Sequence, residues 1–141
     1  MISGAREEEE RERGSMELQH IDHVAITVSD LARSLAWYRD VLGLERRFED
    51  EWGDVPTMVC AGETCVALFP SDGPNPRQVA VRETVSMRHF AFRADRANFE
   101  VAQARFRELG IEAESADHGI AQSVYISDPD GHRIEITTYE V

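Results

Sequence analysis

Three side chains of this 141-residue chain could together hold a metal ion: His23, His89 and Glu135. Two imidazoles and one carboxylate leave coordination positions open, which suits a divalent iron that must also hold a substrate and dioxygen. The same ligands serve zinc, manganese or nickel where the metal acts as a Lewis acid. A single histidine on a strand is more often a surface residue or a satisfied core residue. His23, His89 and Glu135 can therefore be ligands only if the fold brings their side chains together.

Glu135 lies in the second arm of a predicted hairpin at residues 123–136. The arms are joined at residues 128–131 by Asp-Pro-Asp-Gly, in which each residue type suits a tight turn for its own reason. Side chains alternate along a strand, so Ile134 and Ile136 share one face and Glu135 points to the other. A carboxylate there is either a solvated surface residue or a ligand that lines a cavity.

His23 and His89 begin two alternating strands that recur about 66 residues apart. Each strand is followed by a helix with an N-capping residue, apolar positions at helical spacing and a terminal glycine. Short strands then follow in each half, so the plan strand-helix-strand-strand-strand occurs twice. Because each half has little core of its own, the two must pack together. In this register both histidines lie on non-core faces, and Ala67 fills the first-half slot that matches Glu135.

The predicted fold class is α+β, with helices at residues 31–42 and 97–109. Strands are predicted at residues 23–28, 44–51, 57–60, 65–69, 89–93, 111–116, 123–126 and 133–139. Proline and glycine predict a linker at about 70–80, between module one (about 20–70) and module two (about 85–140). Residues 1–17 are rich in glutamate and arginine and cannot bury apolar surface. They are predicted to be a disordered tail or a charge-paired helix outside the domain at 18–141.

The composition excludes several classes of function. The formal net charge is -12, which argues against nucleic acid as a partner because phosphate binding needs a basic surface. The chain has no lysine, which excludes a Schiff-base mechanism. Its apolar runs are too short to span a bilayer and its N-terminus is polar, so a cytoplasmic protein without a membrane partner is expected. Cys60 and Cys65 are expected to be reduced neighbours on paired strands, with a redox pair as the alternative.

The stretches at residues 23–44 and 125–135 resemble the vicinal oxygen chelate superfamily. That superfamily includes glyoxalase I, extradiol dioxygenases, fosfomycin-resistance thiol transferases and bleomycin-resistance proteins. The resemblance implies two tandem βαβββ modules that form a U-shaped, partly open barrel around one metal, held by His23, His89 and Glu135. It also implies a small-molecule substrate with two adjacent oxygens and a homodimer. The sequence leaves open whether the modules pair within one chain or are swapped between subunits.

The resemblance does not by itself fix the reaction, because function depends on the site rather than the fold. Glyoxalase I enzymes have a fourth ligand, a glutamate, at the slot filled here by Ala67. Fosfomycin thiol transferases share the His, His, Glu pattern, but their anion site resembles one that uses a threonine at the position of Ala25, a lysine in the late loop and an arginine beyond the glutamate. This chain has no lysine, and a phosphonate needs fixed cationic donors. Metal-free drug-binding members generally lack the triad. A Lewis-acid isomerase, lyase or transferase stays the main alternative.

The C-terminal part is similar to the extradiol dioxygenase signature in the order and spacing of His118, Tyr125, the turn at 128–131 and Glu135. It departs at Glu114, where that signature has a glycine. The resemblance implies that His118 acts as an acid/base and that the Tyr125 phenol donates a hydrogen bond to an oxygen at the metal. The alternative is that His118 is an exposed loop histidine and that Tyr125 is an aromatic residue of the core or of a cavity. We therefore predict an iron-dependent, extradiol-type dioxygenase that acts on a catechol-like substrate.

Overall fold

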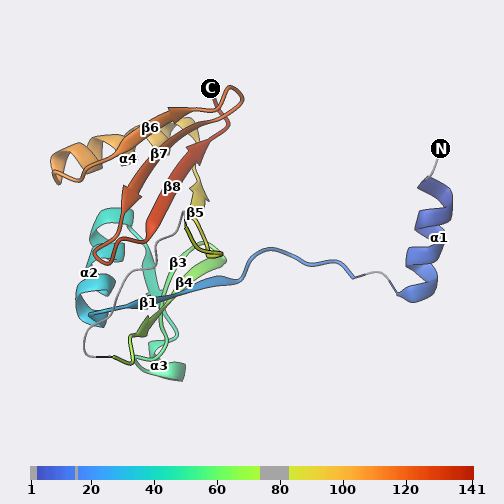
Figure 1. The fold of residues 1–141 in the computed structure, drawn as a ribbon, viewed down its shortest axis with the longest axis horizontal. Helices are drawn as coiled ribbons and strands as arrows, with labels where there is room; N and C mark the ends of the chain where they lie inside the picture. Colours follow the sequence, from blue (N-terminus) through green and yellow to red (C-terminus); the bar gives the residue numbers. More distant parts are fainter. Residues whose placement is uncertain (1–2, 15, 74–82) are drawn as a thin grey trace.

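The computed structural model describes residues 3–14, 16–73 and 83–141. The chain forms two units on one plan (Figure 1). Module one consists of β1 (His23–Val28), α2 (Leu31–Leu42), β2 (Glu45–Arg47), α3 (Glu49–Trp52), β3 (Thr57–Ala61) and β4 (Thr64–Pro70). Module two consists of β5 (Phe90–Arg93), α4 (Arg96–Glu108), β6 (Glu114–Asp117), β7 (Gln122–Ser127) and β8 (Arg133–Thr138). Much of the predicted linker lies outside the described residues, and the domain limits stay predictions.

Each module contains one four-stranded sheet, with strand order β1-β4-β3-β2 in module one and β5-β8-β7-β6 in module two. The first and last strands of each module pair in parallel, and the other neighbours are antiparallel. The two strand orders correspond position by position. The predicted α+β fold of two tandem βαβββ modules is therefore confirmed, and the two sheets are not closed into a barrel.

The two long helices begin in the same way, as expected for a duplicated unit. The Asp30 carboxylate accepts a hydrogen bond from the N–H of Arg33, and the Asp95 carboxylate accepts one from the N–H of Asn98. Each aspartate thus satisfies an N–H group that has no partner within its helix. Gly43 ends α2 with φ 68°, a left-handed conformation that glycine adopts without strain.

One hydrophobic core lies between the sheets and the helices and draws on both modules. Its buried members are Ile26, Val28, Tyr38, Val41, Leu44, Val59, Val66 and Leu68 from module one, and Phe99, Phe106, Val124, Ile126, Ile134 and Ile136 from module two. Trp37 and Leu35 pack against this cluster from the partly buried side of α2. Neither module encloses this core alone, so the prediction that the two must pack together is confirmed.

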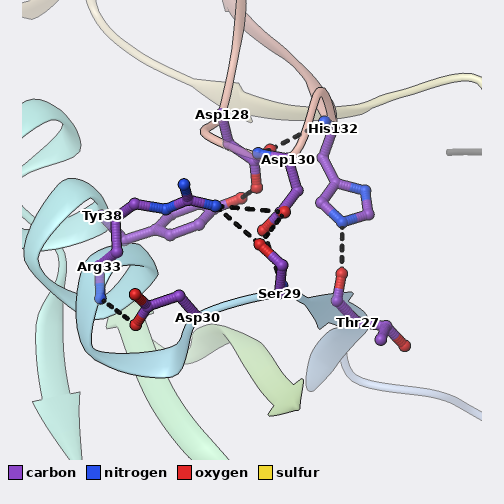
Figure 2. A network of polar contacts seen from close by, with 8 residues as sticks. All are labelled: Thr27, Ser29, Asp30, Arg33, Tyr38, Asp128, Asp130 and His132. Carbon is purple, nitrogen blue, oxygen red and sulfur yellow. Dashed lines mark hydrogen bonds and ion pairs between the residues drawn. The ribbon is translucent and has the colours of Figure 1, made fainter. Parts of the chain in front are cut away.

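A polar network joins the β7–β8 turn to the start of α2 (Figure 2). The buried Asp128 carboxylate accepts hydrogen bonds from the Tyr38 hydroxyl at 2.8 Å and from the N–H of His132 at 2.8 Å. Asp130 accepts from the hydroxyl of Ser29 at 2.5 Å. Burying a carboxylate costs free energy unless such partners are present. Because Tyr38 and Ser29 belong to module one, these hydrogen bonds hold the turn of module two against module one.

Burial and the negative charge of Asp128 raise the pKa of the Tyr38 phenol far above its ordinary value of 10.0. Tyr38 therefore remains a hydrogen-bond donor across the physiological pH range.

The strand predicted at residues 44–51 is wrong in its second half. β2 ends at Arg47, Phe48 takes φ 65°, and the four-residue helix α3 follows. Three acidic residues fill the first turn of α3, where the positive end of the helix dipole favours them. The short helix α3 places Trp52 beside a cavity of module one.

Cys60 and Cys65 form a disulfide, so the expectation of two reduced thiols is corrected. They are direct partners across the antiparallel β3–β4 pair. The disulfide belongs to a second small buried cluster with Met58, Ala67 and Phe69, separate from the shared core.

The N-terminal stretch forms helix α1 (Ser3–Arg13), which lies apart from the two modules (Figure 1). Within the tail predicted at residues 1–17, the structure therefore describes a helix over Ser3–Arg13, and the limit of the tail as a separate unit stays a prediction. Within the described residues, no helix combines the length and apolar character needed to cross a membrane.

Candidate functional site

Glu135 occupies the centre of the module two sheet, on the face opposite the core. It is paired with Ala91 on β5 and with Tyr125 on β7. Its side chain is only 11% exposed, and the ring Nε2 of His89 lies 3.0 Å from Oε1. The Ser123 hydroxyl donates a hydrogen bond to Oε2 at 2.5 Å. The last strand therefore presents a fixed, buried carboxylate beside an imidazole.

His89 and Glu135 fit two neighbouring ligands of one divalent ion. The 3.0 Å between nitrogen and oxygen is a direct ion-pair distance when the imidazole is protonated. With a neutral imidazole, the same two atoms are close enough to bind one ion at adjacent octahedral positions, at about 2.1 Å each. The hydrogen bond from Ser123 is the kind of outer contact that orients a ligating carboxylate. Module two thus offers two of the three predicted ligands in a suitable arrangement.

Tyr125 and His118 lie next to this pair. His118 Nε2 is 3.2 Å from the Tyr125 hydroxyl, and the rings of His89 and Tyr125 meet edge to face with 5.5 Å between centroids. Loss of hydration, and then the negative charge of Glu135, raise the pKa of the Tyr125 phenol, so it stays protonated at neutral pH. The phenol can therefore donate a hydrogen bond, and His118 can exchange a proton with it.

The turn between β6 and β7 fixes the position of His118. The N–H of His118 donates to the carbonyl of Ala121 at 2.8 Å. The carboxylate of Asp117 accepts a hydrogen bond from the N–H of Gly119, also at 2.8 Å. His118 is therefore held by its own turn rather than left on an unconstrained loop.

Glu114, the departure from the extradiol signature, does not displace His118. Its carboxylate forms an ion pair with Arg133 at 2.7 Å, and the Arg133 guanidinium lies 4.9 Å from the centre of the Tyr125 ring. Sequence reasoning gave Arg133 and Ser123 no role. Ser123 lies two residues before Tyr125 on β7, and Arg133 lies two residues before Glu135 on β8, so each shares the face of that site residue. This spacing of two is the sequence signal that could have identified them.

His23, the third predicted ligand, lies on module one. Its side chain is 47% exposed, and its Nδ1 is 2.8 Å from the carboxylate of Asp22. Across the described residues, no three histidine, cysteine, aspartate or glutamate side chains gather closely enough to hold a metal ion. A single copy of the chain therefore brings together His89, His118, Tyr125 and Glu135 but not His23, whose role as a ligand stays a prediction.

His23 instead borders a cavity of about 490 Å³ over the module one sheet. The apolar lining residues are Trp52, Val55, Pro56, Met58, Ala67 and Phe69, and Asp22 and Glu51 complete the lining with His23. Ala67 stands opposite Ala25 and Met58 in the sheet. The slot that corresponds to Glu135 is thus part of an apolar wall, and no fourth ligand is offered there.

Known proteins that are similar to this chain have names from several reaction classes. The chain is 31% identical to catechol-2,3-dioxygenase of Bacillus subtilis over 118 residues, 83% of this chain but only 40% of that protein. It is 28% identical to the glutathione transferase FosA of Serratia marcescens over 84% of this chain and 80% of that protein. A crystal structure of lactoylglutathione lyase from Agrobacterium tumefaciens superposes with a TM-score of 0.67 at 28% identity, covering 87% of this chain and 96% of that one.

Residues 20–136 match the model of one protein family, and this range spans parts of both modules and includes the five predicted site residues. The matched region begins before His23 and ends after Glu135. The chain therefore belongs to the glyoxalase/bleomycin resistance protein/dioxygenase superfamily.

Proposed function

We propose that this protein is an extradiol-type dioxygenase that acts on a small catechol-like substrate. The observation that carries the proposal is the contact between His118 and Tyr125, 3.2 Å apart and directly beside His89 and Glu135. A proton-transfer pair next to two metal ligands is what a reaction on a catechol needs, since the diol must lose protons as it binds. The similarity to a catechol-2,3-dioxygenase supports the same reaction class.

In this proposal His23, His89 and Glu135 hold a divalent iron. When bound, the iron supplies the redox chemistry between catechol and dioxygen. The Tyr125 phenol, kept protonated by its raised pKa, donates a hydrogen bond to a substrate oxygen. His118 removes a proton from the diol and returns it to the product.

We further propose that the site is completed by a second copy of the chain. His89 and Glu135 already lie 3.0 Å apart, whereas His23 is on the other module, beside the module one cavity. A two-fold dimer in which His23 of one copy meets His89 and Glu135 of the other would assemble three ligands, twice per dimer. The predicted homodimer is then a requirement of the site.

Oxygen uptake tests the reaction. Protein purified without oxygen should contain stoichiometric iron and consume dioxygen when a catechol is added. His118→Ala should keep the metal and lose turnover. Stoichiometric metal with no oxygen uptake across a panel of catechols would refute the dioxygenase proposal.

A Lewis-acid thiol transferase is the second candidate, because the chain is 28% identical to a glutathione transferase and matches 80% of its length. Consumption of a thiol without oxygen uptake would favour it. Protein that neither contains nor takes up iron, manganese, zinc or nickel would instead favour a metal-free binding protein.

The cytoplasmic location expected from the sequence stays a prediction. A disulfide such as Cys60–Cys65 is more usual in oxidising compartments. Cell fractionation, combined with thiol labelling of the native protein, would test both the location and the redox state.

A further inference from the structure

The cavity over module one has the walls of a binding site for a flat apolar group. The Trp52 and Phe69 rings and the Met58 thioether contribute apolar surface, and the volume of about 490 Å³ lies in the range of small-molecule sites. Met58 and Ala67 are almost fully buried within the sheet, so they form a fixed floor. Trp52 is 51% exposed, which leaves much of its ring free to cover a ligand.

The segment that carries Trp52 is anchored rather than loose. Arg46 binds Glu49 at 3.3 Å and Asp54 at 2.9 Å, one residue at the start of α3 and one just after it. Phe48 packs against Trp52 with 5.0 Å between ring centroids. The indole is therefore held near the cavity before any ligand arrives, which reduces the entropy cost of binding.

The charged groups of this cavity have one sign. Apart from His23, the ionisable lining residues are Asp22 and Glu51, and no arginine is among the lining residues. Asp22 is already engaged by His23, whereas Glu51 lies beside Trp52 on α3. An anionic ligand would be repelled by both carboxylates, and a cationic ligand would be attracted.

We infer that this cavity binds the ring of the substrate, and that it selects a flat apolar ring with a neutral or positively charged substituent over one with a carboxylate. Trp52 sets the affinity for the ring and Glu51 sets the preference for charge. The inference rests on the proposed function in one respect, namely that His23 at the rim directs the two adjacent oxygens of the ring toward the metal.

Three naphthalene probes that lack adjacent oxygens isolate the cavity from the metal. They are 2-naphthylmethanol (neutral), 2-naphthylmethylamine (cationic) and 2-naphthoate (anionic). Calorimetric titration of the full-length, metal-free protein should give the tightest binding for the amine. The carboxylate should bind on the order of tenfold more weakly than the alcohol, since two carboxylates repel it at short range.

Variants separate the two determinants. Trp52→Ala should weaken binding of all three probes by about tenfold, because it removes the apolar cover. Leu109→Ala is the matched control, since Leu109 is equally exposed but lies at the end of α4. Glu51→Gln should reduce the preference for the amine over the alcohol by about threefold or more. Asp50→Asn removes the same charge from α3 outside the cavity lining and should leave that preference unchanged.

Equal or tighter binding of the carboxylate, no binding of any probe, or unaltered affinities in Trp52→Ala would each overturn the inference. These titrations need no metal and no turnover. Failure of the proposed function would appear instead as missing metal or missing oxygen uptake, so the two failures can be told apart.

Discussion

Modules one and two place different side chains at matching positions of the same sheet. Across the centre of the module two sheet, the row Ala91, Glu135, Tyr125 runs from β5 through β8 to β7. The matching row of module one is Ala25, Ala67, Met58. One row offers a carboxylate and a phenol, and the other offers only apolar groups.

This difference indicates that the two modules have different roles in the proposed site. Module two carries the proposed proton-exchanging groups and two proposed ligands: His89 lies close to Glu135, and His118 lies close to Tyr125. Module one carries an apolar cavity, and its lining residues Met58 and Ala67 share a buried cluster with the disulfide. The strand order is the same in both modules. The proposed chemistry therefore depends on a few residue differences on the sheet face opposite the core rather than on the fold.

The largest effect is expected at Glu135. Glu135→Ala removes the buried carboxylate beside His89 and should lower metal affinity by at least 100-fold, measured as metal content after dialysis. Glu135→Gln keeps an acceptor for Ser123 and should fold normally, with the same loss of metal. Glu114→Gln, on the same sheet but 70% exposed, is the control and should keep its metal. Stoichiometric metal in Glu135→Gln would show that module two is not the metal-binding side.

The next largest effect concerns proton transfer. His118→Ala should lower kcat by about 10²–10⁴-fold with unchanged metal content, because it removes an acid/base group. Tyr125→Phe keeps the ring against His89 and Arg133 and removes only the hydroxyl. It should cost less than His118→Ala. His20→Ala is the control and should cost nothing, because the His20 ring lies 3.8 Å from the exposed carboxylate of Glu63 on module one. A loss of metal in His118→Ala would mean that this histidine is a ligand instead.

The disulfide lies in module one and should contribute to the stability of the folded protein. Replacing both Cys60 and Cys65 by alanine should lower the free energy of unfolding by about 2 kcal/mol, the loss expected for a short closed loop. Denaturant titration with and without a thiol reductant measures it. Reductant should destabilise the wild-type protein and leave the double variant unchanged. A wild-type protein insensitive to reductant would contradict a stabilising cross-link.

The smallest effect concerns the joint between the modules. Tyr38→Phe removes one hydrogen bond to the buried Asp128 and should cost about 1–2 kcal/mol at neutral pH. Because the folded pKa of Tyr38 is raised above 10.0, its contribution is present below pH 10 and is lost as the pH rises further. The variant should therefore show a shallower alkaline loss of stability, measured by denaturant titration from pH 8 to 11. An unchanged alkaline slope would contradict the raised pKa, and Tyr139→Phe, half exposed, is the control.

Much of the fold could be predicted because the sequence carries two copies of one local pattern. The capping aspartates Asp30 and Asp95 and the alternating strands mark both helices and most strands with the same signals. The pattern could not predict α3, because the left-handed turn at Phe48 is a backbone feature with no signal in residue type. Nor could it predict that Tyr38 reaches Asp128, a contact that depends on how the modules pack.

The candidate site could be predicted in part for the same reason. Alternation along β8 placed Glu135 on the face opposite the core, and its contact with His89 follows from the parallel pairing of β5 with β8. The contact of Glu114 with Arg133 required the β6–β7–β8 register, which depends on the length of the intervening turns. The separation of His23 from the other ligands is a property of the whole chain that local patterns do not encode.

Mixing two inactive variants tests the shared site most directly. His23→Ala and Glu135→Ala should each lose the metal as pure proteins. When the two are unfolded together, refolded and loaded with iron, half of the dimers should contain one chain of each kind and one intact site. The mixture should then recover roughly a quarter of the wild-type metal content and oxygen uptake. No recovery in the mixture would contradict a site shared between copies, and retained metal in either pure variant would contradict the ligands themselves.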